Sequence, residues 1–175
     1  MIINIPPWIV TQCSEFATAC AATNKYYASR GQSNLNKITN DIMVGKLGEW
    51  ACHKMLLDKG FKVSEPDMQI HLGRKKSHSP DLSTSTINFS VKTQTLRSVE
   101  DYGMSWLMEK SSLAKFKGHQ VILCIYLGEA KVLIQNIVPF ERLLAVQAAP
   151  KLAYLITKVA FYYQDLLCDS LLTLK

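Results

Sequence analysis

The sequence lacks the cysteine patterns that define disulfide-rich and zinc-binding proteins. Its five cysteines are odd in number and widely spaced, and they form no Cys-x-x-Cys pair or Cys/His cluster. Disulfide frameworks use even sets of cysteines, and structural zinc sites need closely spaced ligands. We therefore expect neither, and interpret the cysteines as buried, reduced thiols of a cytosolic protein. They are Cys13, Cys20, Cys52, Cys124 and Cys168.

Long apolar runs are also absent, as is a positively charged N-terminal segment. No apolar stretch reaches the roughly 20 residues that a membrane-spanning helix needs. The N-terminal segment is apolar, but it carries no basic residue and is interrupted by Pro6-Pro7, unlike a secretory signal peptide. We therefore expect a cytoplasmic protein with no membrane partner.

Acidic residues are fewer than basic ones. The chain has 14 Asp and Glu against 20 Lys and Arg, which gives a formal charge of +6 and a pI near 9.1. A basic balance suits a polyanionic partner such as nucleic acid. With 175 residues, 48% of them hydrophobic, the chain is long enough for one domain with its own core.

Apolar periodicity, prolines and glycines predict a mixed α/β fold. Helices are expected over residues 8–29, 36–58, 140–148 and 152–174, with a short one beginning at 105–110. Asn40 or Asp41 would cap the second of these. Strands are expected over 60–64, 68–72, 87–93, 119–127 and 130–137, the last two as a hairpin, whereas 96–102 looks irregular. This order predicts one domain, a mixed sheet flanked by helices, with a helical extension (1–40), a core (41–137) and C-terminal helices (138–175).

A short polar segment between residues 79 and 95 is predicted to be a β-hairpin. Leu82 would lie in the first strand, and residues 84–86 near the turn. Side chains alternate along the second strand, which separates Ile87, Phe89, Val91 and Thr93 from Asn88, Ser90, Lys92 and Gln94. Asp81, on the neighbouring strand, would then lie beside Lys92. A carboxylate and a lysine brought together on a sheet can hold a divalent metal and position a water.

These residues resemble the PD-(D/E)XK superfamily of restriction-endonuclease-like phosphodiesterases. The family pattern is Pro-Asp, a variable gap, and then Glu or Asp, any residue and Lys. Pro80, Asp81 and Lys92 match it, and Ser90 stands where a carboxylate is usual. The helix predicted before the hairpin carries Glu49, as the family's helix carries a Glu. The resemblance covers about residues 41 to 135 and implies an α-β-β-β-α-β core and a metal-dependent DNA endonuclease of phage or restriction type.

The resemblance also implies a role for each matching residue. Asp81 and the backbone carbonyl of Val91 would bind Mg²⁺, for which Mn²⁺ can substitute, and Glu49 would add a second carboxylate. Lys92 would orient the attacking water and stabilise its deprotonated form. Gln94, on the same face of the strand, would hold a phosphate or a water.

Ser90 departs from the family pattern and leaves the site one carboxylate short. Some restriction enzymes with Ser at this position bring a Glu from the following helix, for which this chain offers Glu100, Asp101 and Glu109. We prefer Glu109, because it lies in the short helix expected there. If neither Glu49 nor Glu109 reaches the metal, the alternative is a catalytically inactive nucleic-acid-binding protein that retains the nuclease fold.

Several basic residues are candidates for contacts with DNA phosphates. They are Arg30, Arg74, Lys75, Lys76 and Arg97. His78 could serve as a base instead. Asp67, in a second Pro-Asp pair, is an alternative metal ligand that we rank below Asp81, because no compact hairpin links it to Lys92.

The aromatic C-terminal helix suggests a third hypothesis, a protein-interaction subunit.

If the protein is instead an endonuclease that cuts both strands of a palindromic site, it would have to act as a homodimer.

Overall fold

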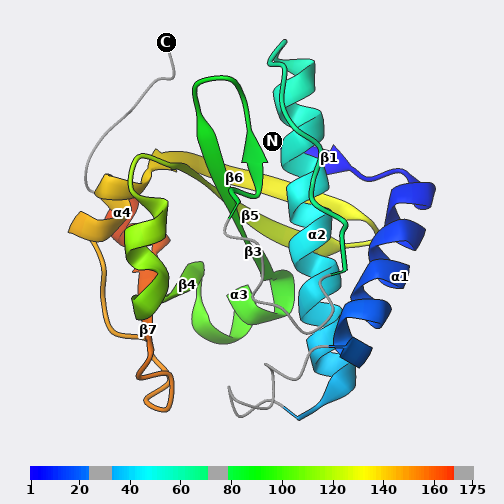
Figure 1. Ribbon diagram of the computed structural model, residues 1–175. Coiled ribbons are helices and arrows are strands. Elements are labelled where there is room, and N and C mark those ends of the chain that lie inside the picture. The colour runs from blue at the N-terminus through cyan, green and yellow to red at the C-terminus, as the bar shows by residue number, and fades with distance from the viewer. Residues whose placement is uncertain (24–32, 71–78, 168–175) are drawn as a thin grey trace.

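The computed structural model describes residues 1–23, 33–70 and 79–167, and it shows a mixed α/β fold around a curled β-sheet (Figure 1). Five strands form this sheet in the order β1-β6-β5-β3-β2. β3 and β5 are parallel and the other neighbours are antiparallel. The strands are β1 (Ile2–Asn4), β2 (Leu82–Ser83), β3 (Asn88–Thr95), β5 (Gln120–Gly128) and β6 (Lys131–Pro139). The predicted mixed sheet flanked by helices is confirmed.

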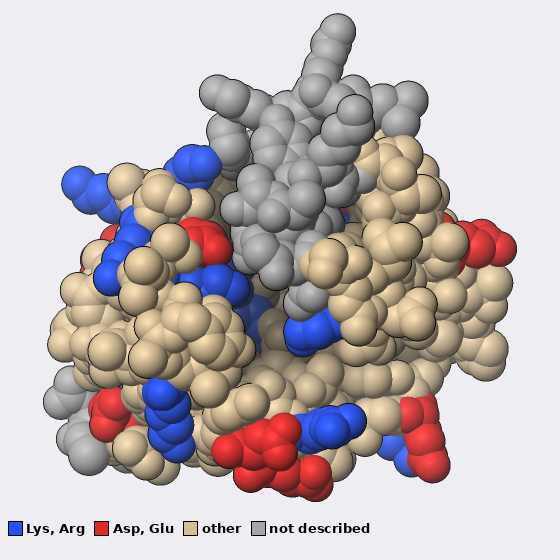
Figure 2. Space-filling model, turned by 90° about the horizontal axis from the view of Figure 1, so that it is seen from below, with Lys and Arg blue, Asp and Glu red and all other residues tan. Residues whose placement is uncertain are grey.

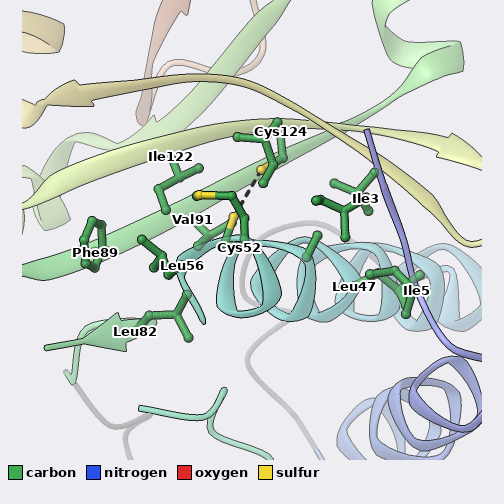
Figure 3. Close-up of a cluster of buried hydrophobic side chains, with 14 of the residues drawn as sticks. Ile3, Ile5, Leu47, Cys52, Leu56, Leu82, Phe89, Val91, Ile122 and Cys124 are labelled. Carbon is green, nitrogen blue, oxygen red and sulfur yellow. Dashed lines mark hydrogen bonds between the residues drawn. The ribbon is translucent and has the colours of Figure 1, made fainter. Parts of the chain in front are cut away.

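Two long helices, α1 (Pro7–Thr23) and α2 (Leu35–Asp58), pack side by side against one face of this sheet (Figure 1). Apolar side chains of α2, such as Leu47 and Leu56, meet Val91 and Ile122 of the sheet in a buried cluster (Figure 3). α2 begins earlier than expected, because Asn34 caps it by accepting a hydrogen bond from the Lys37 N–H at 3.1 Å. The prediction of a cap at residue 40 or 41 was therefore wrong.

Shorter elements cover the opposite face. Val121, Leu123 and Ile125 of β5 point to this side, whereas Ile122 and Cys124 point toward α2, as strand alternation requires. A second, two-stranded sheet of β4 and β7 packs there and buries Trp106 and Phe161. The elements are α3 (Leu96–Tyr102), β4 (Ser105–Glu109), the 3₁₀ helix η2 (Lys110–Phe116), α4 (Phe140–Ala145), β7 (Lys158–Tyr162) and α5 (Tyr163–Leu167).

Three predictions on the C-terminal side of the hairpin were wrong. Residues 96–102 are helical, not irregular, and the Thr95 side chain caps α3 by accepting from the Ser98 N–H. The helix expected from 105 is strand β4, in which Trp106 and Met108 are buried and Leu107 is 37% exposed. The helix expected over 152–174 is replaced, within the described residues, by β7 and the short α5. Pairing of β4 with β7 overrides the local preference of both segments.

The N-terminal part also differs from the prediction. The expected helical extension supplies β1, which pairs with β6 at the edge of the sheet. No strand forms over residues 61–70, a segment that contacts β2 through Ser64, whose N–H donates to the Ser83 carbonyl at 2.8 Å. Pro66 has no N–H to extend that pairing. Residues 24–29 and 71–72, which we expected in the first helix and the second strand, lie outside the described residues.

The β5–β6 hairpin is confirmed, with a two-residue turn at Glu129-Ala130 in which both residues have positive φ. The expected helix after residue 139 is also present, as the shorter α4. Over the part of the chain that the structure describes, none of the helices is both long enough and apolar enough to cross a membrane.

Candidate metal and DNA site

The hairpin of β2 and β3 has the two faces that alternation predicts. Leu82 pairs with Phe89 and Ser83 with Asn88, and the Thr84 side chain and backbone close the turn onto Ile87. Phe89 and Val91 point to the side of β3 that faces α2, into one buried cluster with Leu56 and Leu82 (Figure 3). Ser90 and Lys92 point to the other face, in register with Val121 and Leu123 of β5. β3 therefore separates an apolar face from a polar one.

Asp81 lies immediately before β2, and its carboxylate reaches across to β3. Its Oδ2 accepts a hydrogen bond from the Val91 N–H at 2.8 Å. The same oxygen lies 3.8 Å from the Lys92 ammonium, and both side chains are about three-quarters buried. The structure thus brings Asp81, Val91 and Lys92 together, as the sequence interpretation expected.

The Lys92 ammonium is held by oxygen atoms and by an aromatic ring. It donates to the Val91 carbonyl at 3.2 Å and lies 4.9 Å from the centre of the Phe116 ring in η2. A positive group therefore already sits between the Asp81 carboxylate and the Val91 carbonyl. Both oxygens are hard donors of the type that Mg²⁺ and Mn²⁺ bind while they retain several waters.

The protein offers only a few ligands at this point. Within residues 1–23, 33–70 and 79–167, no group of three or more His, Cys, Asp or Glu side chains is arranged to hold a metal ion. A divalent cation here would have the Asp81 carboxylate and the Val91 carbonyl as protein oxygens, and water for most other positions.

Glu49 lies on the other side of β3 from Lys92, on α2. Its carboxylate is 2.6 Å from the ammonium of Lys46, and both side chains are nearly buried. Both charged groups shift the pKa of the Cys13 thiol on α1, which Glu49 raises and Lys46 lowers. Glu49 therefore lies on the side of α2 that faces α1, and its lysine partner is on α2 itself. Its predicted role as a metal ligand stays a prediction.

Gln94 and Glu109 have partners elsewhere. The Gln94 amide donates to the Gly103 carbonyl at 3.0 Å and accepts from the Ser105 N–H at 2.9 Å, which ties β3 to the start of β4. Glu109 ends β4 and lies 3.9 Å from the Lys158 ammonium on β7. Gln94 thus has a structural task that the sequence did not indicate, and Glu109 pairs across the small sheet.

Of the basic residues expected to contact DNA, Arg97 is exposed on α3. Arg30, Arg74, Lys75 and Lys76 lie outside the described residues. Figure 2 shows Lys and Arg side chains inside and beside a hollow on one face of the molecule. A basic hollow of this kind suits a phosphate backbone.

Asp67, the alternative metal ligand, lies in a different environment. It lines a cleft of about 520 Å³ together with Trp8, Trp50 and Glu65. Its Oδ1 accepts from the Gln69 N–H at 2.9 Å. Two carboxylates in one cleft repel a polyanion, so this cleft suits DNA less well than the Asp81 and Lys92 face.

His119 is the residue that the sequence interpretation missed. Its Nδ1 lies 3.0 Å from the Ser90 hydroxyl, and Ser90 is only 1% exposed. Burial lowers the pKa of His119, while Asp81 raises it and Lys92 lowers it. The ring therefore lies close enough to Asp81 and Lys92 for both charges to act on it. The signal was its position just before the most apolar strand, but only the parallel pairing of β3 with β5 shows that this strand end lies beside Ser90.

Comparisons of this chain with protein-family models, with curated proteins and with solved structures find no match.

Proposed function

We propose that the protein is a metal-dependent DNA endonuclease with a restriction-endonuclease-like core. One observation carries the proposal: Asp81 and Lys92 converge from neighbouring strands, 3.8 Å apart, beside the Val91 carbonyl. The matching sequence pattern, the preceding helix α2 and the formal charge of +6 support it. The expected partner is DNA, and the expected ion is Mg²⁺ or Mn²⁺.

Asp81 and the Val91 carbonyl would hold the ion, which when bound neutralises phosphate charge and lowers the pKa of a coordinated water. Lys92 would then release these two oxygens and turn its ammonium toward the water or the scissile phosphate. The Val91 N–H keeps the Asp81 carboxylate in place, because it bonds to one oxygen and leaves the other available.

A second candidate function is DNA binding without cleavage. Two observations favour it: Ser90 carries no charge where the family has a carboxylate, and Glu49 is paired with Lys46. Such a protein would bind DNA in a salt-dependent manner and cut none of it.

A plasmid-cleavage assay at low salt tests both candidates, with Mg²⁺, with Mn²⁺ and with EDTA. We expect metal-dependent nicking or linearisation that falls about 100-fold or more in Lys92→Ala, the typical effect of removing a catalytic proton-transfer group. Asp81→Asn is the sharper second variant, because its amide oxygen can still accept from the Val91 N–H while the charge is lost.

Lys54→Ala is the matched control, since it removes a lysine whose partner is the exposed Asp58 on α2. It should cut like the wild type. Full activity in Lys92→Ala or Asp81→Asn would contradict the endonuclease proposal. Retained DNA binding with no cutting by the wild type in any metal would favour the second candidate.

A further inference from the structure

The proposed nuclease site is one carboxylate short of the family pattern, and a histidine lies beside the position concerned. In the family pattern, the residue two positions before the lysine supplies a carboxylate. Here that residue is Ser90, which is buried and bonded to the Nδ1 of His119 at 3.0 Å. The Ser90 hydroxyl therefore links this position on β3 to the imidazole of His119.

We propose that His119, oriented by Ser90, takes the place of the missing carboxylate and binds the divalent ion through its Nε2. The inference rests on the proposed function, from which it takes an ion bound by Asp81 and the Val91 carbonyl. It predicts a centre of one carboxylate, one carbonyl and one imidazole, which prefers Mn²⁺ to Mg²⁺.

The ring is held as a metal-binding histidine usually is. Such a histidine has its second nitrogen fixed by a hydrogen bond, which sets the tautomer and the orientation of the ring. The Ser90 hydroxyl can accept such a bond from the Nδ1–H, which leaves Nε2 with its lone pair for a metal, and the ring meets Phe116 edge-on with centres 5.9 Å apart. The backbone is fixed as well, because the His119 N–H donates to the Phe116 carbonyl and its carbonyl accepts from Phe140.

The second nitrogen is available for a ligand. In the part of the chain that the structure describes, Nε2 forms no hydrogen bond with another residue, and the side chain is half-buried. Asp81 and Lys92 both act electrostatically on the ring. Glu141 does so too, but its Oε1 already accepts from the Gly118 N–H at 2.9 Å.

The types of ligand atom at the proposed site determine which metal ion it prefers. Carboxylate, carbonyl and water ligands suit Mg²⁺, whereas an imidazole favours first-row transition metals. Replacing a carboxylate by an imidazole also removes one negative charge, which weakens the binding of hard Mg²⁺ more than that of Mn²⁺. A preference for Mn²⁺ over Mg²⁺ is therefore expected from Ser90 and His119 together.

Direct metal binding tests the assignment without relying on activity. We would titrate the wild type, His119→Gln and Ser90→Ala with Mn²⁺ by calorimetry and electron paramagnetic resonance, and then repeat the calorimetry with Mg²⁺. His119→Gln should bind Mn²⁺ at least about tenfold more weakly, and Ser90→Ala about 10- to 100-fold more weakly, as for loss of a bond that orients a ligand. The Mg²⁺ affinity of His119→Gln should change little, so the preference for Mn²⁺ should disappear.

A second measurement needs only the wild type and stays valid if a variant misfolds. Substoichiometric Mn²⁺ should broaden the imidazole resonances of His119 before those of His53, which lies on α2 against Trp50. Equal broadening of both, or unchanged Mn²⁺ affinity in a folded His119→Gln, would overturn the inference.

The outcome separates this inference from the proposed function. A wild type that binds Mn²⁺ through His119 but cuts no DNA would support the ligand and reject the endonuclease. A wild type that cuts DNA with unchanged Mn²⁺ affinity in His119→Gln would support the endonuclease and reject the ligand. A wild type that binds no Mn²⁺ would reject the metal centre altogether.

Discussion

Gly48 of α2 lies close to Thr93 of β3, and we predict that this close approach depends on the absence of a side chain at Gly48. A Cβ added at Gly48 would overlap the Thr93 hydroxyl oxygen, and it would lie 3.1 Å from the Thr93 Cβ and 3.3 Å from its Cγ2. Rotating the threonine exchanges one close atom for another, because its Cβ does not move. Gly48→Ala should therefore force the helix away from β3.

A second glycine in the same helix gives the matched control. A Cβ at Gly45 would meet nothing within 4 Å. Gly45→Ala should stabilise the protein by about 1 kcal/mol through helix propensity alone. Gly48→Ala gains the same propensity but incurs an overpacking cost of about 1–3 kcal/mol. The difference between the two variants cancels the propensity and measures the steric cost.

Thermal and urea unfolding of both variants supply the measurement. For a chain of this size, 1 kcal/mol corresponds to a shift in Tm of about 2–4 °C. Gly45→Ala should melt above the wild type, and Gly48→Ala should melt below Gly45→Ala by about 2–12 °C. Thr93→Ala removes the hydroxyl oxygen and the Cγ2 and keeps only the Cβ, so Gly48→Ala should cost less in that background. Equal Tm values for the two alanine variants would refute the close approach of α2 to β3.

Two further predictions concern other residues of the same region. Burial raises the pKa of the Cys13 thiol from 9.0 to about 11, so the unfolded chain ionises first and stability should be lost as the pH rises from 9 to 11. Urea unfolding across that pH range should show the decrease in the free energy of unfolding. An equally steep decrease in Cys13→Ala would show that Cys13 is not its cause. Gln94→Ala removes two hydrogen bonds between β3 and the start of β4, and should lower stability by about 1–3 kcal/mol with unchanged Mn²⁺ affinity. Weaker Mn²⁺ binding at unchanged stability would instead show that Gln94 contributes to the proposed metal site.

Local sequence patterns predicted the elements whose partners are near in the chain. The β2–β3 hairpin, the β5–β6 hairpin and α2 each have their own turn or apolar period, and all three are present. The faces of β3 followed from alternation alone, which is why the sequence predicts that Asp81 and Lys92 lie together.

Pairings between distant segments were not predictable from those patterns. β4 and β7 are about 50 residues apart in the chain. Each is too short for its sequence pattern to distinguish a strand from a helix. His119 was missed for the same reason, since its position beside Ser90 depends on the parallel pairing of β3 with β5. A sequence pattern names the residues that fit a motif, but it does not show which side chains from distant segments lie beside them.

The two faces of β3 limit where a further metal ligand beside Lys92 can come from. Val91 and Thr93 face α2, so Ser90 and Lys92 face η2 and the start of β5. Glu49 lies on the helix that packs against the first of these faces, whereas the Lys92 ammonium lies on the second. A further ligand for an ion bound beside Lys92 is therefore expected on the second face, where His119 is hydrogen-bonded to Ser90. Mn²⁺ binding by His119→Gln is thus the most informative measurement on this site, because it tests whether the imidazole bonded to Ser90 is a metal ligand.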